Sequence, residues 1–268
     1  MLDAVMMIWF TLTAVSVVFV ALDIHHTPEN PVLKWGFILL TLYAGPFALL
    51  LYVFGCRKRG AAEHAKFVSA RWRQVLGSTM HCVAGDGVGI LAGAVIASIV
   101  ALPLLAEIAL EYVLGFAFGW MIFQALFMRD MAGGSYLRSM KNTFISELLS
   151  MNCLMGGMIA VSVLAWRGVP EAHDPTHGLF WFRMSIALMV GFVCAYPMNW
   201  WLVSHHLKHG MMTVPPPGEA QPDTPPKEKK MSGMKMGPPV SAGKIAFMAA
   251  VSFAVLAVGL LIAFAGRG

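Results

Sequence analysis

The residues best suited to chemistry lie in one short stretch, residues 78–89, where polar sequence gives way to an apolar run. It contains His81, Cys82 and Asp86, and the last two are four positions apart, so a helix would place them on one face. An ionisable side chain near the centre of a membrane helix costs about 2.5–3.5 kcal/mol and usually marks a functional site. Thiolate and imidazole groups are ligands of transition-metal ions. The stretch therefore predicts a metal site. The competing interpretation is that Asp86 hydrogen-bonds a neighbouring helix and His81 faces the lipid headgroups.

A second set of metal-ligating residue types follows one helical face at the end of a later apolar segment. Spacings of four, seven and four residues separate Cys194, Met198, His205 and His209. If the two segments meet in the fold, five side chains would form the metal site: His81, Cys82, Asp86, His205 and His209. Thiolate and thioether ligands favour Cu(I), and the chain has 20 Met, so copper is the predicted ion, although most of these Met side chains are expected to fill the core.

Membrane-spanning helices must position these side chains. The chain of 268 residues is 58% hydrophobic and 12% charged, whereas a soluble domain carries about 25% charged residues. A hydrocarbon core about 30 Å thick requires roughly 20 apolar residues per helix. Seven segments meet this requirement: residues 4–22, 35–55, 81–103, 107–128, 144–166, 180–203 and 244–265. The predicted fold class is all-α, a polytopic transmembrane helix bundle of about seven helices.

The basic residues predict the orientation of this bundle. If all seven segments cross the membrane, all but four of the 19 Lys and Arg residues fall on one side. The exceptions are Lys34, Arg167, Arg183 and Arg267. The positive-inside rule makes the basic side cytoplasmic and places the amino terminus there, with Asp23, His25, His26 and Glu29 on the outer face. We expect a multi-pass protein of the bacterial inner (plasma) membrane, with the lipid bilayer and no nucleic acid as its partner.

Four regions follow along the chain. Residues 1–72 contain two helices and a basic cytoplasmic loop, and residues 73–212 form a four-helix membrane core. Residues 213–241 are rich in Pro, Lys and Met, which is typical of a disordered linker. Residues 242–268 form the last helix.

Four motifs carry a resemblance to a known family. They are residues 79–89 (TMHCVAGDGVG), 111–120 (EYVLGFAFGW), 198–202 (MNWWL) and 208–211 (KHGM). With these, the chain from about residue 70 to 212 resembles the bacterial membrane family labelled domain of unknown function 4396. The resemblance implies a multi-helix membrane domain and a loose connection to copper and heavy-metal homeostasis, with no established activity. Its functional set would be His81, Cys82, Asp86, Glu111, Asn199 and His209.

Three functions remain open. The first is transport or membrane binding of a transition metal. The second is a redox protein that holds haem between His81 and a histidine of the sixth segment. The third is an accessory or assembly protein that binds a membrane-protein partner through glycine stripes such as Gly85, Gly89 and Gly93. The hydrolase motifs H-E-x-x-H and G-x-S-x-G are absent, so no catalytic residues are predicted and an enzyme is the less favoured interpretation.

Overall fold

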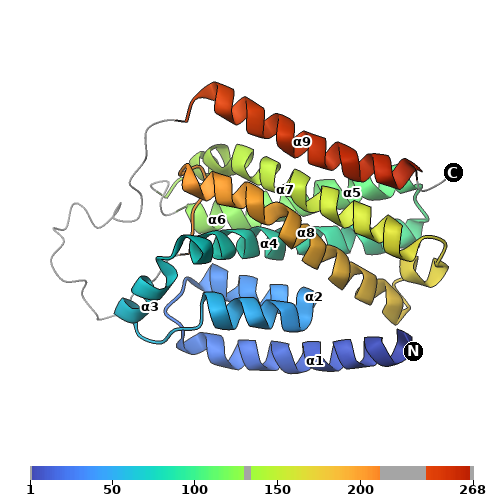
Figure 1. Cartoon of the computed structure of the whole chain (residues 1–268), viewed down its shortest axis with the longest axis horizontal. Coiled ribbons are helices and arrows are strands. Elements are labelled where there is room, and N and C mark those ends of the chain that lie inside the picture. Colours follow the sequence, from blue (N-terminus) through green and yellow to red (C-terminus); the bar gives the residue numbers. More distant parts are fainter. Residues whose placement is uncertain (1, 130–133, 212–239, 266–268) are drawn as a thin grey trace.

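The computed structural model describes residues 2–129, 134–211 and 240–265, and every regular element in these ranges is helical (Figure 1). The long helices are α1 (Leu2–Asp23), α2 (Pro31–Gly55), α4 (Arg71–Val100), α5 (Leu104–Ala117), α7 (Tyr136–Trp166), α8 (Gly178–Ser204) and α9 (Ala242–Ala265). The shorter elements are η1 (Ile24–His26), α3 (Ala61–Val68), the π-helical turn η2 (Phe118–Gln124), α6 (Ala125–Met128) and η3 (Pro170–His173).

The prediction of an all-α membrane protein is confirmed. Seven helices among the described residues are long and apolar enough to cross a membrane, with α5, η2 and α6 joined into one of them. Several begin earlier than predicted, because polar first turns extend beyond the apolar run. In particular, α4 begins at Arg71, so Cys82 lies about three turns inside this helix and not at its opening. Residues 213–239 of the predicted linker lie outside the described residues.

The second helix, α2, does not run straight. Gly45 has φ 51° and ψ −130°, which is not helical, and Pro46 follows it. A straight helix would separate Phe37 from Tyr52 by about 22 Å, yet their rings lie 5.4 Å apart. The two halves of α2 therefore fold back on each other as a helical hairpin whose tip is Gly45.

The tip of this hairpin reaches only the middle of the bundle. A Cβ at Gly45 would lie 2.3 Å from Oγ1 of Thr13, in the middle of α1, and Tyr43 packs against Gly87, in the middle of α4. Beyond the tip, a largely apolar cavity of about 570 Å³ lies between α1, α4 and α8. The hairpin thus enters the bundle and returns without crossing it.

This return changes the topology. Tyr52 hydrogen-bonds Thr27 (3.0 Å) and Asp23 (2.7 Å), so both ends of α2 lie at the same end of the bundle. Arg57 forms an ion pair with Asp23 at 2.8 Å across the same junction. In Figure 1, α1 begins and α9 ends at the opposite end of the bundle. The predicted placement of the amino terminus beside the basic loops is therefore corrected, because one segment counted as a crossing is a hairpin.

The central helix of the bundle is α4, which is buried along most of its length. The predicted glycine stripe is its contact with α5: a Cβ at Gly89 would lie 2.1 Å from the Leu114 carbonyl oxygen, and one at Gly93 would lie 2.8 Å from the Glu111 Cα. Such contacts leave no room for side chains and let the two backbones touch. The stripe packs helices within one chain.

After α8, residues 205–211 turn back over the start of α4. Gln74 Nε2 donates a hydrogen bond to the Met211 carbonyl oxygen at 2.9 Å, and Met211 packs on Gly77. This return brings Lys208 into the bundle, where it is 4% exposed.

Candidate functional site

A polar cluster in the bundle interior joins four side chains from three segments. Cys82 and Asp86 come from α4, Glu147 from α7 and Lys208 from the segment after α8. The Cys82 thiol lies 3.0 and 2.8 Å from the two Glu147 carboxylate oxygens. The Lys208 ammonium donates to Glu147 Oε2 at 3.1 Å and also to Cys82 Sγ. We call these four residues the Cys82 cluster. None is more than 4% exposed.

A glycine in the π-helical turn makes room for this cluster. A Cβ at Gly119 would lie 1.8 Å from Oδ1 of Asp86 and 3.0 Å from Oε1 of Glu147. No other residue type fits there without displacing both carboxylates. π-helical turns inside α-helices frequently occur at functional sites. Here the turn faces the two acids of the cluster.

The charges of the cluster are only partly balanced. Burial opposes the charged form of Lys208, but the Cys82 sulfur and the Glu147 carboxylate, which accept its hydrogen bonds, outweigh burial and keep the pKa of Lys208 above its usual value. One ammonium thus faces two carboxyl groups and a thiol. Both carboxylate oxygens of Asp86 are buried and without a hydrogen-bond partner among the described residues. Buried polar atoms of this kind are rare and call for a ligand, a proton or an ion.

The donor atoms are close enough to share one metal ion. One donor atom each from Cys82, Asp86 and Glu147 lies within 4.8 Å of the other two. In a tetrahedral zinc site with Zn–S near 2.3 Å and Zn–O near 2.0 Å, neighbouring ligand atoms are about 3.3–3.6 Å apart. Small side-chain rotations would bring the three groups to that spacing.

The predicted histidines lie elsewhere. The His81 ring points toward α6 and η2, with centroids 4.9 Å from Phe127 and 5.7 Å from Phe123, and both of its nitrogens are buried. His205 turns back on α8, with Nδ1 2.9 Å from the Trp201 carbonyl oxygen. His209 follows Lys208, and within the described ranges its buried Nε2 has no hydrogen-bond partner. Burial lowers the pKa of His209 to about 4, so the ring is neutral.

Of the five predicted ligands, the structure therefore brings Cys82 and Asp86 together, and it completes their cluster with Glu147 and Lys208. Glu147 was visible in the sequence at helical spacing from Met151 and Met155, but nothing there showed which helix it faces. By charge pattern alone, Lys208 is one of the basic residues that end a helix on the cytoplasmic side. The signal that could have found it is the KHGM motif, in which it stands beside a predicted ligand.

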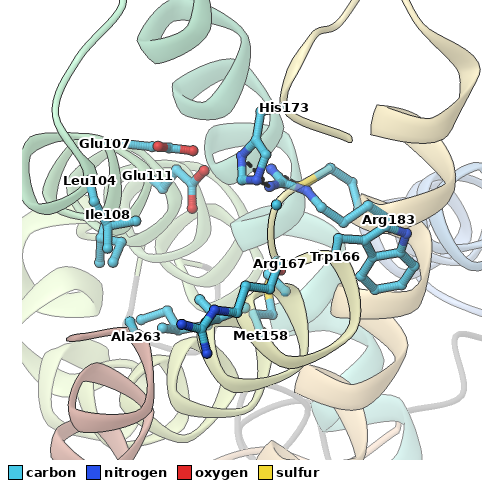
Figure 2. Close-up of a pocket in the computed structure, with 15 residues that line it drawn as sticks. Leu104, Glu107, Ile108, Glu111, Met158, Trp166, Arg167, His173, Arg183 and Ala263 are labelled. Carbon is cyan, nitrogen blue, oxygen red and sulfur yellow. Dashed lines mark hydrogen bonds between the residues drawn. The ribbon is translucent and has the colours of Figure 1, made fainter. Parts of the chain in front are cut away.

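A second polar region lies at the opposite end of the bundle. A cavity of about 200 Å³ lies there. Figure 2 shows Glu107 and Glu111 of α5 facing His173 and Arg183 across it. The Arg183 guanidinium lies 2.7 Å from Nδ1 of His173. Glu111, 9% exposed, belongs to the set implied by the family resemblance, but it lines this cavity and not the Cys82 cluster.

Comparison with known proteins assigns the central part of the chain to a family. No curated protein and no solved structure matches it. A family model described as Domain of unknown function (DUF4396) matches residues 71–208, from the first residue of α4 to Lys208. The match covers half of the chain and includes all four residues of the Cys82 cluster, and the chain therefore belongs to this family.

Proposed function

We propose that this protein binds a divalent transition-metal ion within the membrane, through Cys82, Asp86 and Glu147. The observation that carries the proposal is the approach of three potential ligand atoms to within 4.8 Å inside a bundle of apolar helices. The buried carboxylate of Asp86 supports it, because no side chain of the described residues donates a hydrogen bond to either oxygen and a cation would satisfy both.

The donor set favours a borderline divalent ion such as Zn²⁺. One thiolate and two carboxylates match the ligands that zinc accepts. Cu(I) prefers thiolate and thioether sulfur, and two carboxylates add charge without adding soft donors. Copper, the ion predicted from the sequence, is therefore the less suitable occupant of this cluster.

Lys208 would compete with the metal for the same partners. At 4 Å, a divalent cation and an ammonium group repel each other by about 8 kcal/mol at an effective dielectric constant of 20. Lys208 must therefore withdraw when the metal binds, and the segment 205–211 would move with it. This coupling gives the protein a means to open the site toward the end of the bundle that carries the basic loops.

The orientation of the site in the membrane follows from the same loops. Arg57, Lys58 and Arg59 lie at the junction of α2 and α3, and Lys34 joins them because α2 folds back. The positive-inside rule makes this end cytoplasmic. In a bacterial inner membrane the Cys82 cluster would open toward the cytoplasm, and α1 would begin on the outer side.

Zinc affinity of the purified protein, measured by competition with a chelator under reducing conditions, tests the proposal. Cys82→Ser and Glu147→Gln should each weaken binding by more than about 100-fold. Cys153→Ser is the matched control, because Cys153 is also a buried thiol (3% exposed) on α7 but lies outside the cluster. Equal affinity of the wild type and Cys82→Ser at this site would contradict the proposal.

A structural ion-pair network is the second candidate, because Lys208 bonds two members of the cluster and so ties the segment after α8 to α4 and α7. The variant Lys208→Met separates the two functions. If the ammonium competes with a metal, its loss raises zinc affinity by at least about tenfold. A purely structural lysine would leave the affinity unchanged and lower only the thermal stability.

A further inference from the structure

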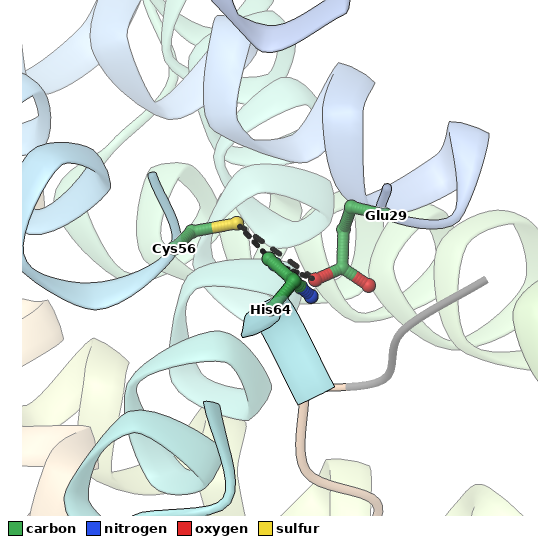
Figure 3. A group of neighbouring side chains, drawn as sticks. All are labelled: Glu29, Cys56 and His64. Atoms are coloured by element: carbon green, nitrogen blue, oxygen red, sulfur yellow. Dashed lines mark hydrogen bonds and ion pairs between the residues drawn. The ribbon is translucent and has the colours of Figure 1, made fainter. Parts of the chain in front are cut away.

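A second group of metal-ligating side chains forms where the α2 hairpin closes. Glu29 lies just before α2, Cys56 directly after it and His64 on the short helix α3. Figure 3 shows the three side chains pointing toward one another from these separate segments. They meet only because α2 returns to the end where it began. On a straight α2, Glu29 and Cys56 would lie on opposite sides of the membrane.

The three donor atoms form a nearly equilateral triangle. Cys56 Sγ is 3.8 Å from Glu29 Oε2 and 3.8 Å from His64 Nε2. The third side, between His64 Nε2 and Glu29 Oε2, is 3.6 Å. Ligand atoms around a zinc ion are about 3.3–3.8 Å apart when the geometry lies between tetrahedral and trigonal. One ion at the centre of the triangle would reach all three atoms with little movement.

The environment suits a bound ion. The Glu29 and His64 side chains are fully buried, and Cys56, Tyr52 and Ile24 at the same junction are each 0% exposed. A thiol is a weak hydrogen-bond donor and acceptor, so its two hydrogen bonds of 3.8 Å stabilise the present arrangement little. A metal ion would bind the same three groups at about 2.0–2.3 Å.

We propose that Glu29, Cys56 and His64 form a second divalent metal site, with zinc as its fitting occupant and a fourth position open to water or an exchangeable ligand. One sulfur, one nitrogen and one oxygen ligand make a mixed set of the kind found where three protein ligands hold zinc. The ion would clamp both ends of the hairpin to α3. This site is independent of the Cys82 cluster, and all three of its ligands precede the segment matched by the family model.

The test uses Co²⁺ as a coloured substitute for zinc, with the full-length Cys82→Ser variant as the starting protein. This variant should still bind one equivalent of Co²⁺, with a sulfur-to-cobalt charge-transfer band. The band should disappear when Cys56→Ser is added and should remain when Cys153→Ser is added. Failure of the function proposed for the Cys82 cluster would leave this result unchanged, so the two proposals fail separately.

A second variant covers the case in which Cys56→Ser does not fold. His64→Gln in the Cys82→Ser background keeps the thiol but removes a ligand, and it should weaken Co²⁺ binding by more than about 100-fold. Zn²⁺ should also raise the unfolding temperature of the Cys82→Ser protein, and a chelator should reverse the rise. A Cys82→Ser protein that binds no Co²⁺ and whose unfolding temperature does not respond to Zn²⁺ would overturn the inference.

Discussion

The helical hairpin in α2 depends on one glycine, and the variant Gly45→Ala tests it. The backbone at Gly45 has φ 51° and ψ −130°, a conformation that costs a residue with a side chain about 1–3 kcal/mol. A Cβ there would also lie 2.3 Å from Oγ1 of Thr13, and forcing an extra carbon into a packed contact costs about 1–3 kcal/mol. Together these effects predict a loss of about 2–6 kcal/mol.

Thermal unfolding of the purified protein measures this loss. For a chain of this size, 1 kcal/mol corresponds to about 2–4 °C, so the unfolding temperature should fall by roughly 5–20 °C. Adding Thr13→Ala to Gly45→Ala should recover the steric part of the loss and leave the backbone part. Gly243→Ala, at an open position near the start of α9, should not lower the unfolding temperature.

Two results would refute this reasoning. If Gly45→Ala were as stable as the wild type, the chain could not adopt the left-handed conformation at residue 45. If Thr13→Ala gave no recovery, the tip of the hairpin could not lie against α1. Either result would favour an α2 that crosses the membrane as a continuous helix.

Three further predictions concern topology, the cluster and pH. Single cysteines can be introduced at the exposed positions His25, Lys58 and Glu171 and labelled with an impermeant maleimide. His25→Cys and Lys58→Cys should react from the same side of the membrane, and Glu171→Cys from the other side. Labelling of His25→Cys and Lys58→Cys from opposite sides would mean that α2 crosses. Gly119→Ala removes no ligand but displaces Asp86 and Glu147, so zinc affinity should fall at least tenfold, while Gly243→Ala leaves it unchanged. The pKa of His209 is lowered to about 4 by burial, below the ordinary 6.5, so the folded protein binds fewer protons than the unfolded chain between these values. The stabilising contribution of the neutral ring is complete above about pH 6.5, and the free energy of unfolding falls by about 1–3 kcal/mol as the pH falls toward 4. His209→Gln should reduce this loss in acid-dependent unfolding. An unchanged pH profile would contradict the burial of a neutral ring.

Hydropathy predicted the helical segments, because any helix that crosses a membrane must contain a long run of apolar residues. It could not predict the hairpin, since the run from Trp35 to Phe54 is apolar whether the helix is straight or folded. The local signal was Gly45 followed by Pro46 in the middle of that run. A second signal was Lys34, which breaks the charge pattern if α2 crosses the membrane. The hairpin returns Lys34 to the basic side and so removes this exception.

The candidate site was predictable only where its residues share a helix. Cys82 and Asp86 lie four residues apart and do face the same neighbours, whereas His81, one residue earlier, is rotated by about 100° and packs on Phe127. Glu147 and Lys208 are distant in sequence, so their arrival depends on how α4, α7 and the end of α8 pack. Spacing within one helix does not determine that packing.

X-ray absorption at the zinc edge tests the central claim most directly, using the Cys56→Ser protein loaded with one equivalent of Zn²⁺ so that the Cys82 cluster is the site observed. The account predicts one sulfur neighbour at about 2.3 Å and oxygen or nitrogen neighbours at about 2.0 Å, with the sulfur lost when Cys82→Ser is added. A zinc spectrum with only oxygen and nitrogen neighbours, identical with and without Cys82, would contradict it.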